Sequence, residues 1–352
     1  AGHRWAGVLG IKLAAALVGS LALVALVGPL FYPGERQTGI ALAALSLLPD
    51  AFAGCAAARV KARQRMEVSS AVNLGTRLLY AVVGLYLVWR GADESLLLAA
   101  YAATALLGAL IFAAVLRAGQ MVPRWGGSTT LWPKILAEST PFALNGMVAT
   151  LYQRLGMLML AYWQGDVAAG LYGAAYRLWE ALGLVPASVL DALFPELARA
   201  GGADGRARLE RLYRRGRRAL AGLAGLLALS GLLSAPWIVR LLYGQAFDGP
   251  AAATILRLLF LAFPLSHLAL LNGHALYAVG QQRQVTAAMI AVTALHALGN
   301  AVSIPRWSYW GAVGVALASE VALFLSLQML VRRALLAPDL QTVGSGPQRM
   351  AR

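Results

Sequence analysis

Charged residues are scarce in this sequence of 352 residues, and cysteine is almost absent. Only 13% of the residues are charged, against roughly 25% in an average soluble domain, and 59% are hydrophobic. A soluble core cannot absorb that much apolar surface, so we expect lipid to surround most of the chain. The one cysteine, Cys55, excludes both a disulfide framework and a cysteine-based zinc or iron–sulfur site.

The sequence also lacks the short motifs of common enzymes. It contains no phosphate-binding loop with a Walker lysine, no HExxH, no GxSxG and no paired-aspartate glycosyltransferase signature. His267 and His274 are two helical turns apart, or about 10 Å, which is too far for them to chelate one metal ion together. We therefore expect the protein not to be an enzyme and to hold no metal or other cofactor.

Apolar runs recur along the whole sequence, and each is about as long as a helix that crosses a bilayer, which needs about 20 residues. Backbone polar groups in lipid must be satisfied within the segment, so each run is predicted to be a helix. This makes the chain an all-α polytopic membrane protein with about ten transmembrane helices. The predicted spans are 8–31, 39–58, 70–89, 95–116, 137–163, 167–198, 219–242, 251–279, 285–305 and 309–331.

Basic residues are divided unequally between the two ends of these spans. With the N-terminus on side one and the loops alternating, side one holds 22 of the 30 lysines and arginines and side two holds four. By the positive-inside rule, both termini are cytoplasmic. The densest cluster, 203–220, is expected to contact anionic membrane lipids. The net charge of +15 is thereby explained without a nucleic-acid partner.

A weak internal repeat suggests how the spans are grouped. Segments 65–84 and 283–302 each follow a basic turn and open a pair of spans that ends at another basic cluster. This equivalence predicts a partial N-terminal bundle of four helices (1–130), a C-terminal bundle of six (131–336) and a disordered cytoplasmic tail (337–352). A two-lobed transporter has six helices in each lobe, so we expect the first two helices to be missing.

Four arginines lie inside predicted spans, where ionisable groups are costly and usually face a cavity or a partner. Arg154, Arg177 and Arg257 all fall in the outer half of the membrane and are predicted to line one cationic cavity that binds anionic headgroups. Alternatively, each arginine pairs with a buried carboxylate. Glu180 follows Arg177 by three residues on the same helix face, so that pair in particular has a structural alternative.

Acidic residues inside spans are candidates for ion coupling. Glu320 lies at mid-span and is the best candidate to carry a coupling proton or sodium ion, and Glu180 is a second. Helix packing against a neighbouring amide or arginine is the competing interpretation for Glu320.

Residues 139–199 carry a recognisable series of motifs: PF at 141–142, LYQR at 151–154, GDVAAGLYGAAYRL at 165–178 and LFPELAR at 193–199. Further motifs follow in order at 241–259, 276–284 and 304–320. The series resembles the polysaccharide-transport (Wzx-like) flippases of the multidrug/oligosaccharidyl-lipid/polysaccharide exporter (MOP) superfamily. One position departs from the pattern of these flippases. Similar proteins often carry an acidic residue two positions after the arginine of LYQR, and here Gly156 follows Arg154 at that place.

The resemblance implies two bundles related by a pseudo-two-fold axis, a MATE-like architecture here lacking its first two helices. It implies transport of undecaprenyl-diphosphate-linked oligosaccharides to the periplasmic leaflet of a bacterial inner membrane, for O-antigen, capsule or exopolysaccharide synthesis. Arg154 and Arg177 are the cavity residues carried over by resemblance, and polysaccharide polymerase and glycosyltransferases are implied partners. A lipid II flippase and a cation-coupled multidrug exporter of the same superfamily remain alternatives.

Overall fold

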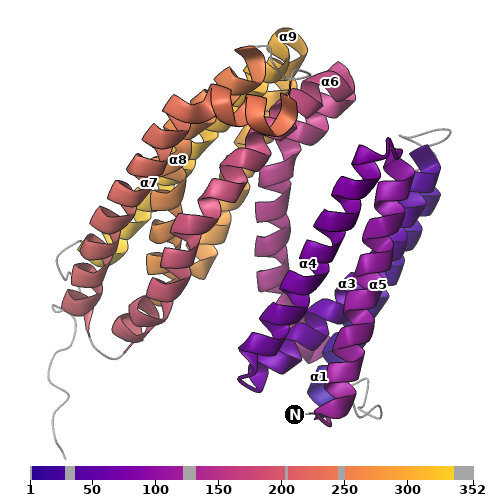
Figure 1. Cartoon of the computed structure of the whole chain (residues 1–352). Coiled ribbons are helices and arrows are strands. Elements are labelled where there is room, and N and C mark those ends of the chain that lie inside the picture. Colours follow the sequence, from indigo (N-terminus) through magenta and orange to yellow (C-terminus); the bar gives the residue numbers. More distant parts are fainter. Residues whose placement is uncertain (1, 28–35, 122–131, 203–204, 245–249, 337–352) are drawn as a thin grey trace, which may run out of the picture. The chain divides into compact units, whose positions relative to one another are not determined.

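The computed structural model describes residues 2–27, 36–121, 132–202, 205–244 and 250–336 (Figure 1). Within these ranges every regular element is a helix, which confirms the predicted all-α fold. The tail 337–352, predicted to be disordered, lies outside the described residues. The chain forms two compact units, Ala1–Pro141 and Phe142–Arg352. The sequence instead places a boundary at residue 130.

The N-terminal unit is a bundle of four long helices. These are α1 (Gly2–Ala22), continued by the π-helical turn η1 (Leu23–Val27), then α3 (Arg36–Ala62), α4 (Met66–Trp89) and α5 (Glu94–Ala118). Helix α3 packs against both α1 and α5, and α4 packs against α5. Asp93 begins α5 as its N-cap, since its carboxylate accepts a 3.1 Å hydrogen bond from the backbone N–H of Leu96.

The C-terminal unit consists of α6 (Trp132–Gly202), α7 (Arg206–Tyr243), α8 (Pro250–Ala278) and α9 (Gln282–Val331), with the π-helical turn η4 (Arg332–Leu336) at its end. Helix α8 packs against both α7 and α9, and Figure 1 shows α7 and α8 running alongside each other. Among the described helices, α6 alone includes residues of both units.

Helices α6 and α9 are each two helices joined at one residue with a non-helical backbone. Gly165 joins the two segments of α6 with φ 80° and ψ −178°, a conformation that in practice only glycine adopts. Ser308 joins the segments of α9 with φ 49° and follows Pro305. Among the described residues, eight helices are long and apolar enough to cross a membrane. The two joined helices bring the number of segments to ten, as the sequence predicts.

Two clusters of buried apolar side chains hold the C-terminal unit together. One gathers residues near Gly165 and Ser308, among them Tyr172, Phe260 and Ile304. The other lies toward the opposite ends of the helices and includes Leu190 and Leu276. The surfaces of both units also carry exposed apolar side chains. Trp89 of the N-terminal unit is 80% exposed, and Trp237 and Leu241 of the C-terminal unit are 77% and 84% exposed. So many exposed apolar side chains are typical of a surface that contacts lipid.

Candidate functional site

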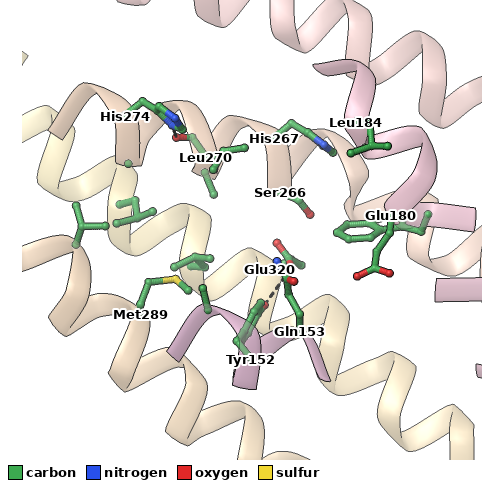
Figure 2. A pocket seen from close by; sticks show the side chains of 18 of the residues that line it. Tyr152, Gln153, Glu180, Leu184, Ser266, His267, Leu270, His274, Met289 and Glu320 are labelled. Atoms are coloured by element: carbon green, nitrogen blue, oxygen red, sulfur yellow. Dashed lines mark hydrogen bonds between the residues drawn. The ribbon is translucent and has the colours of Figure 1, made fainter. Parts of the chain in front are cut away.

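A cavity of about 480 Å³ lies within the C-terminal unit, between residues of α6, α8 and α9 (Figure 2). Its wall is mostly apolar but includes four aromatic side chains, Tyr152, Tyr176, Trp179 and Tyr277. Two carboxylates, Glu180 and Glu320, also line it, and none of its lining residues is an arginine or lysine. The cavity therefore combines an apolar, aromatic wall with a small number of polar groups, as ligand sites commonly do.

Glu320 is tied into the wall of this cavity by Tyr152. The second segment of α9 carries Glu320, and the first segment of α6 carries Tyr152, whose hydroxyl donates a 3.0 Å hydrogen bond to Glu320 Oε1 (Figure 2). Ser266 of α8 lies beside the same carboxylate. The hydroxyl groups of Tyr152 on α6 and Ser266 on α8 thus bring three helices together around the carboxyl group of Glu320 on α9.

Glu180 forms the second polar arrangement, in which one carboxylate pairs with two arginines. Arg154 approaches it with both terminal nitrogens, Nη2 at 3.1 Å from Oε1 and Nη1 at 3.4 Å from Oε2. Arg177 Nη1 lies 3.3 Å from Oε2. The Arg177 side chain is 63% exposed, against 31% for Arg154 and 23% for Glu180. Two positive charges thus share one negative charge, and the cluster keeps a net charge of +1.

The joint at Gly165 explains why these three side chains meet. Arg154 lies eleven residues before Gly165 and Glu180 fifteen residues after it, so the pair joins the two segments of α6 across the bend. Arg177 and Glu180 are three residues apart on one helix, where side chains are neighbours. The ion pair between Arg177 and Glu180, which the sequence offered as an alternative to a free arginine, is therefore present in the structure. Arg154 pairs with the same carboxylate.

Arg257, the third predicted cavity residue, makes a different contact. It lies on α8, and its Nε donates a 3.1 Å hydrogen bond to the backbone carbonyl of Leu232 on α7. Its side chain is exposed. None of the three arginines lines the 480 Å³ cavity. The structure thus brings Arg154 and Arg177 together around Glu180. Arg257 is not part of this cluster and instead connects α8 to α7 by its hydrogen bond.

The aromatic wall of the cavity was not predicted from the sequence. Tyr176 and Trp179, which line the cavity, follow Tyr172 of the apolar core on α6 at spacings of four and three residues, with neighbouring ring centroids 5.8 and 5.3 Å apart. That spacing places them on one helix face and was a usable signal. Tyr152 gave no such signal, because its contact with Glu320 depends on the packing of segments 168 residues apart.

The two histidines of α8 also line the cavity, and each contacts its own helix. The Nδ1 atoms of His267 and His274 lie 2.8 Å from the backbone oxygens of Phe263 and Leu270, respectively. In the described ranges, no three His, Cys, Asp or Glu side chains come close enough together to hold a metal ion.

Comparisons with known proteins agree with this architecture. A family model described as "Polysaccharide biosynthesis protein" matches residues 5–200, more than half of the chain, and the MatE model matches residues 141–302. No curated protein sequence matches the chain significantly.

Several solved structures share the fold at low sequence identity. The lipid II flippase MurJ in an inward closed conformation has a TM-score of 0.77 at 11% identity, over 94% of this chain and 72% of that one. A eukaryotic MATE transporter has a TM-score of 0.73 at 11% identity, over 94% and 78%. A MOP superfamily transporter from Pyrococcus furiosus has a TM-score of 0.64 at 14% identity, over 96% and 82%.

The two family-model matches and the shared fold support a multi-pass membrane protein of the MOP superfamily, either flippase-like or MATE-like. The solved structures that share its fold are those of a flippase and of transporters. Because the matching model covers more than half of its length, the chain belongs to the polysaccharide biosynthesis protein family.

Proposed function

We propose that this protein flips lipid-diphosphate-linked oligosaccharides across the membrane by alternating access, with Arg154 and Arg177 binding the diphosphate. The observation that carries the proposal is the cluster of two arginines around one carboxylate, which leaves a net positive charge inside membrane-spanning segments. Positive charge at this depth is costly and is retained where it serves a ligand or a partner.

The chemistry of the guanidinium group suits a diphosphate. Arginine offers a planar fork of N–H donors that matches two phosphate oxygens at once, and it stays charged under all physiological conditions. Two unit charges 4 Å apart attract by about 1 kcal/mol in water and by about 4 kcal/mol near a protein surface. A water-poor transport site therefore strengthens this recognition. Arg177, 63% exposed, is the more accessible of the two side chains.

The family and the shared fold support a lipid-linked saccharide as the substrate. The family model is named for polysaccharide biosynthesis, and the MurJ structure is that of a lipid II flippase. In this proposal the protein resides in a bacterial inner membrane with both termini in the cytoplasm, and it moves its substrate toward the periplasmic leaflet. Anionic lipids contact its basic loops, and polysaccharide polymerase and glycosyltransferases act on the same substrate.

Ion coupling belongs to the same proposal, with Glu320 as the group that carries a proton or a sodium ion. Its carboxylate accepts a hydrogen bond from Tyr152 and lines the cavity beside Ser266. Glu180 is less suited to this task because two arginines already neutralise its charge.

A second candidate function is cation-coupled export of amphipathic organic cations. Two carboxylates and four aromatic side chains line the cavity, and such a wall suits a cation better than an anion.

A third candidate, flipping of lipid II, follows from the same chemistry of Arg154 and Arg177 that the first proposal uses. Rescue of cells depleted of their own lipid II flippase would favour that third candidate.

Export of surface glycan tests the proposal in cells. Arg154→Ala and Arg177→Ala, each replacing the wild-type gene, are expected to abolish export while protein levels stay unchanged. Arg90→Ala is the matched control, because Arg90 lies at the end of α4 and packs on the ring of Tyr86. Normal export by both arginine variants would contradict the proposal.

A further inference from the structure

We infer that Glu180 is an internal counter-anion that occupies the two arginines until the phosphate group of the substrate displaces it. This role rests on the proposed function and adds a residue that sets how tightly the substrate is held. It differs from ion coupling, because the carboxylate acts here as a competitor of the substrate.

The contacts of Glu180 place it where a phosphate would bind. Arg154 presents both terminal nitrogens to the two carboxylate oxygens, at 3.1 and 3.4 Å, in the forked arrangement that the same nitrogens would offer to a phosphate. Arg177 approaches Oε2 at 3.3 Å. A phosphate group that engages the fork of Arg154 must therefore share it with Glu180 or replace Glu180.

The structure also provides space for a displaced Glu180. The residue lines the 480 Å³ cavity, and Figure 2 shows its carboxylate apart from the contact between Tyr152 and Glu320. Trp179, next to it in the chain, lines the same cavity, and its indole N–H has no hydrogen-bond partner among the described residues. A carboxylate that leaves the arginines thus has a cavity beside it, and one residue of the cavity wall carries an unpaired donor.

A built-in competitor serves a transporter because a substrate that is bound too tightly is not released. Two arginines without a counter-anion would hold a diphosphate with their full charge, and each binding event would then end in slow dissociation. When Glu180 returns to the arginines, it replaces the contacts that the leaving phosphate gives up. Removal of its charge is therefore expected to strengthen binding and to slow turnover.

Binding of geranylgeranyl diphosphate to the purified full chain in detergent tests this inference, with the uncharged alcohol geranylgeraniol as the reference ligand. Glu180→Gln is expected to lower the Kd for the diphosphate by about two- to fivefold, as removal of one partly exposed charge implies. It should leave the Kd for the alcohol unchanged. Glu210→Gln is the matched control, because Glu210 pairs with Arg214 on the exposed face of α7, away from the cavity.

Glu180→Asp is the second variant, in case the glutamine variant does not fold. Its shorter carboxylate cannot reach both arginines equally, so it is expected to bind the diphosphate more tightly than the wild type but less tightly than Glu180→Gln. Unchanged or weaker diphosphate binding by the folded Glu180 variants would overturn the inference. If Arg154→Ala and Arg177→Ala also bind the diphosphate like the wild type, the proposed function itself fails. If those arginine variants lose binding, only the role of Glu180 is refuted.

Discussion

The hydroxyl of Tyr152 donates a hydrogen bond of 3.0 Å to Glu320, which lies 168 residues further along the chain. This contact joins the first segment of α6 to the second segment of α9, at opposite ends of the sequence of the C-terminal unit. Two carboxylates line the cavity, and Glu320 is the one with no arginine partner among its described contacts.

Tyr152→Phe is predicted to destabilise the protein while keeping the ring in place. The variant removes one hydrogen bond to a carboxylate, which contributes about 1.5–3 kcal/mol. We expect a lower melting temperature in detergent. Tyr162→Phe, in which the changed side chain is 72% exposed, is expected to melt like the wild type. Equal melting temperatures for all three proteins would show that the contact with Glu320 contributes nothing to stability.

Glu320→Gln is predicted to separate transport from its ion gradient. The amide keeps an acceptor for the hydroxyl of Tyr152 but can neither bind a proton at physiological pH nor attract a sodium ion. Transport by proteoliposomes should then stop responding to an imposed proton or sodium gradient. Glu196→Gln, on an exposed position of α6, should respond like the wild type. An unchanged gradient response in Glu320→Gln would exclude Glu320 as the coupling group.

Gly311→Ala is predicted to destabilise α9 at its joint. A β-carbon at Gly311 would lie 2.5 Å from the backbone oxygen of Ser303, across the bend at Ser308, so the two segments would have to move apart. Overpacking of this kind costs about 1–3 kcal/mol. Gly314→Ala is the control, because nothing lies within 4 Å of a β-carbon there. Thermal melting of both variants checks the prediction, and equal stability would contradict the close approach of the segments.

The proposed cytoplasmic placement of the termini predicts which turns react with a membrane-impermeant maleimide. Cys55 is buried and is first replaced by alanine. Single cysteines are then placed at Gln64, between α3 and α4, and at Ala92, between α4 and α5. In intact cells, with the outer membrane permeabilised, Ala92→Cys should be labelled and Gln64→Cys should not. The reverse pattern would invert the topology.

Much of this fold could be predicted from the sequence, because lipid imposes helices of a known length. The predicted breaks at 163–167 and 305–309 enclose Gly165 and Ser308, where the backbone leaves the helical conformation. Spacing on a single helix also gave the pair of Arg177 and Glu180. These features depend only on residues close together in the chain.

The arrangement of the site could not be predicted in the same way. Arg154 meets Glu180 only because the two segments of α6 pack across Gly165, and no sequence pattern fixes how far one segment slides along the other. From the sequence, Gly156 indicated only that an acidic partner two residues after Arg154 is absent, which left the partner of Arg154 open. The partner lies on the neighbouring segment, and tertiary packing supplied it.

Leaflet transfer in reconstituted vesicles tests the central proposal most directly. The full chain is placed in liposomes that contain a fluorescent lipid-diphosphate oligosaccharide, and a membrane-impermeant quencher reports how much of the lipid has crossed. The wild type should move the lipid under an ion gradient, and the variant with both Arg154→Ala and Arg177→Ala should be no faster than protein-free liposomes. Equal transfer by wild type and variant, or none by the wild type, would contradict the proposed diphosphate site.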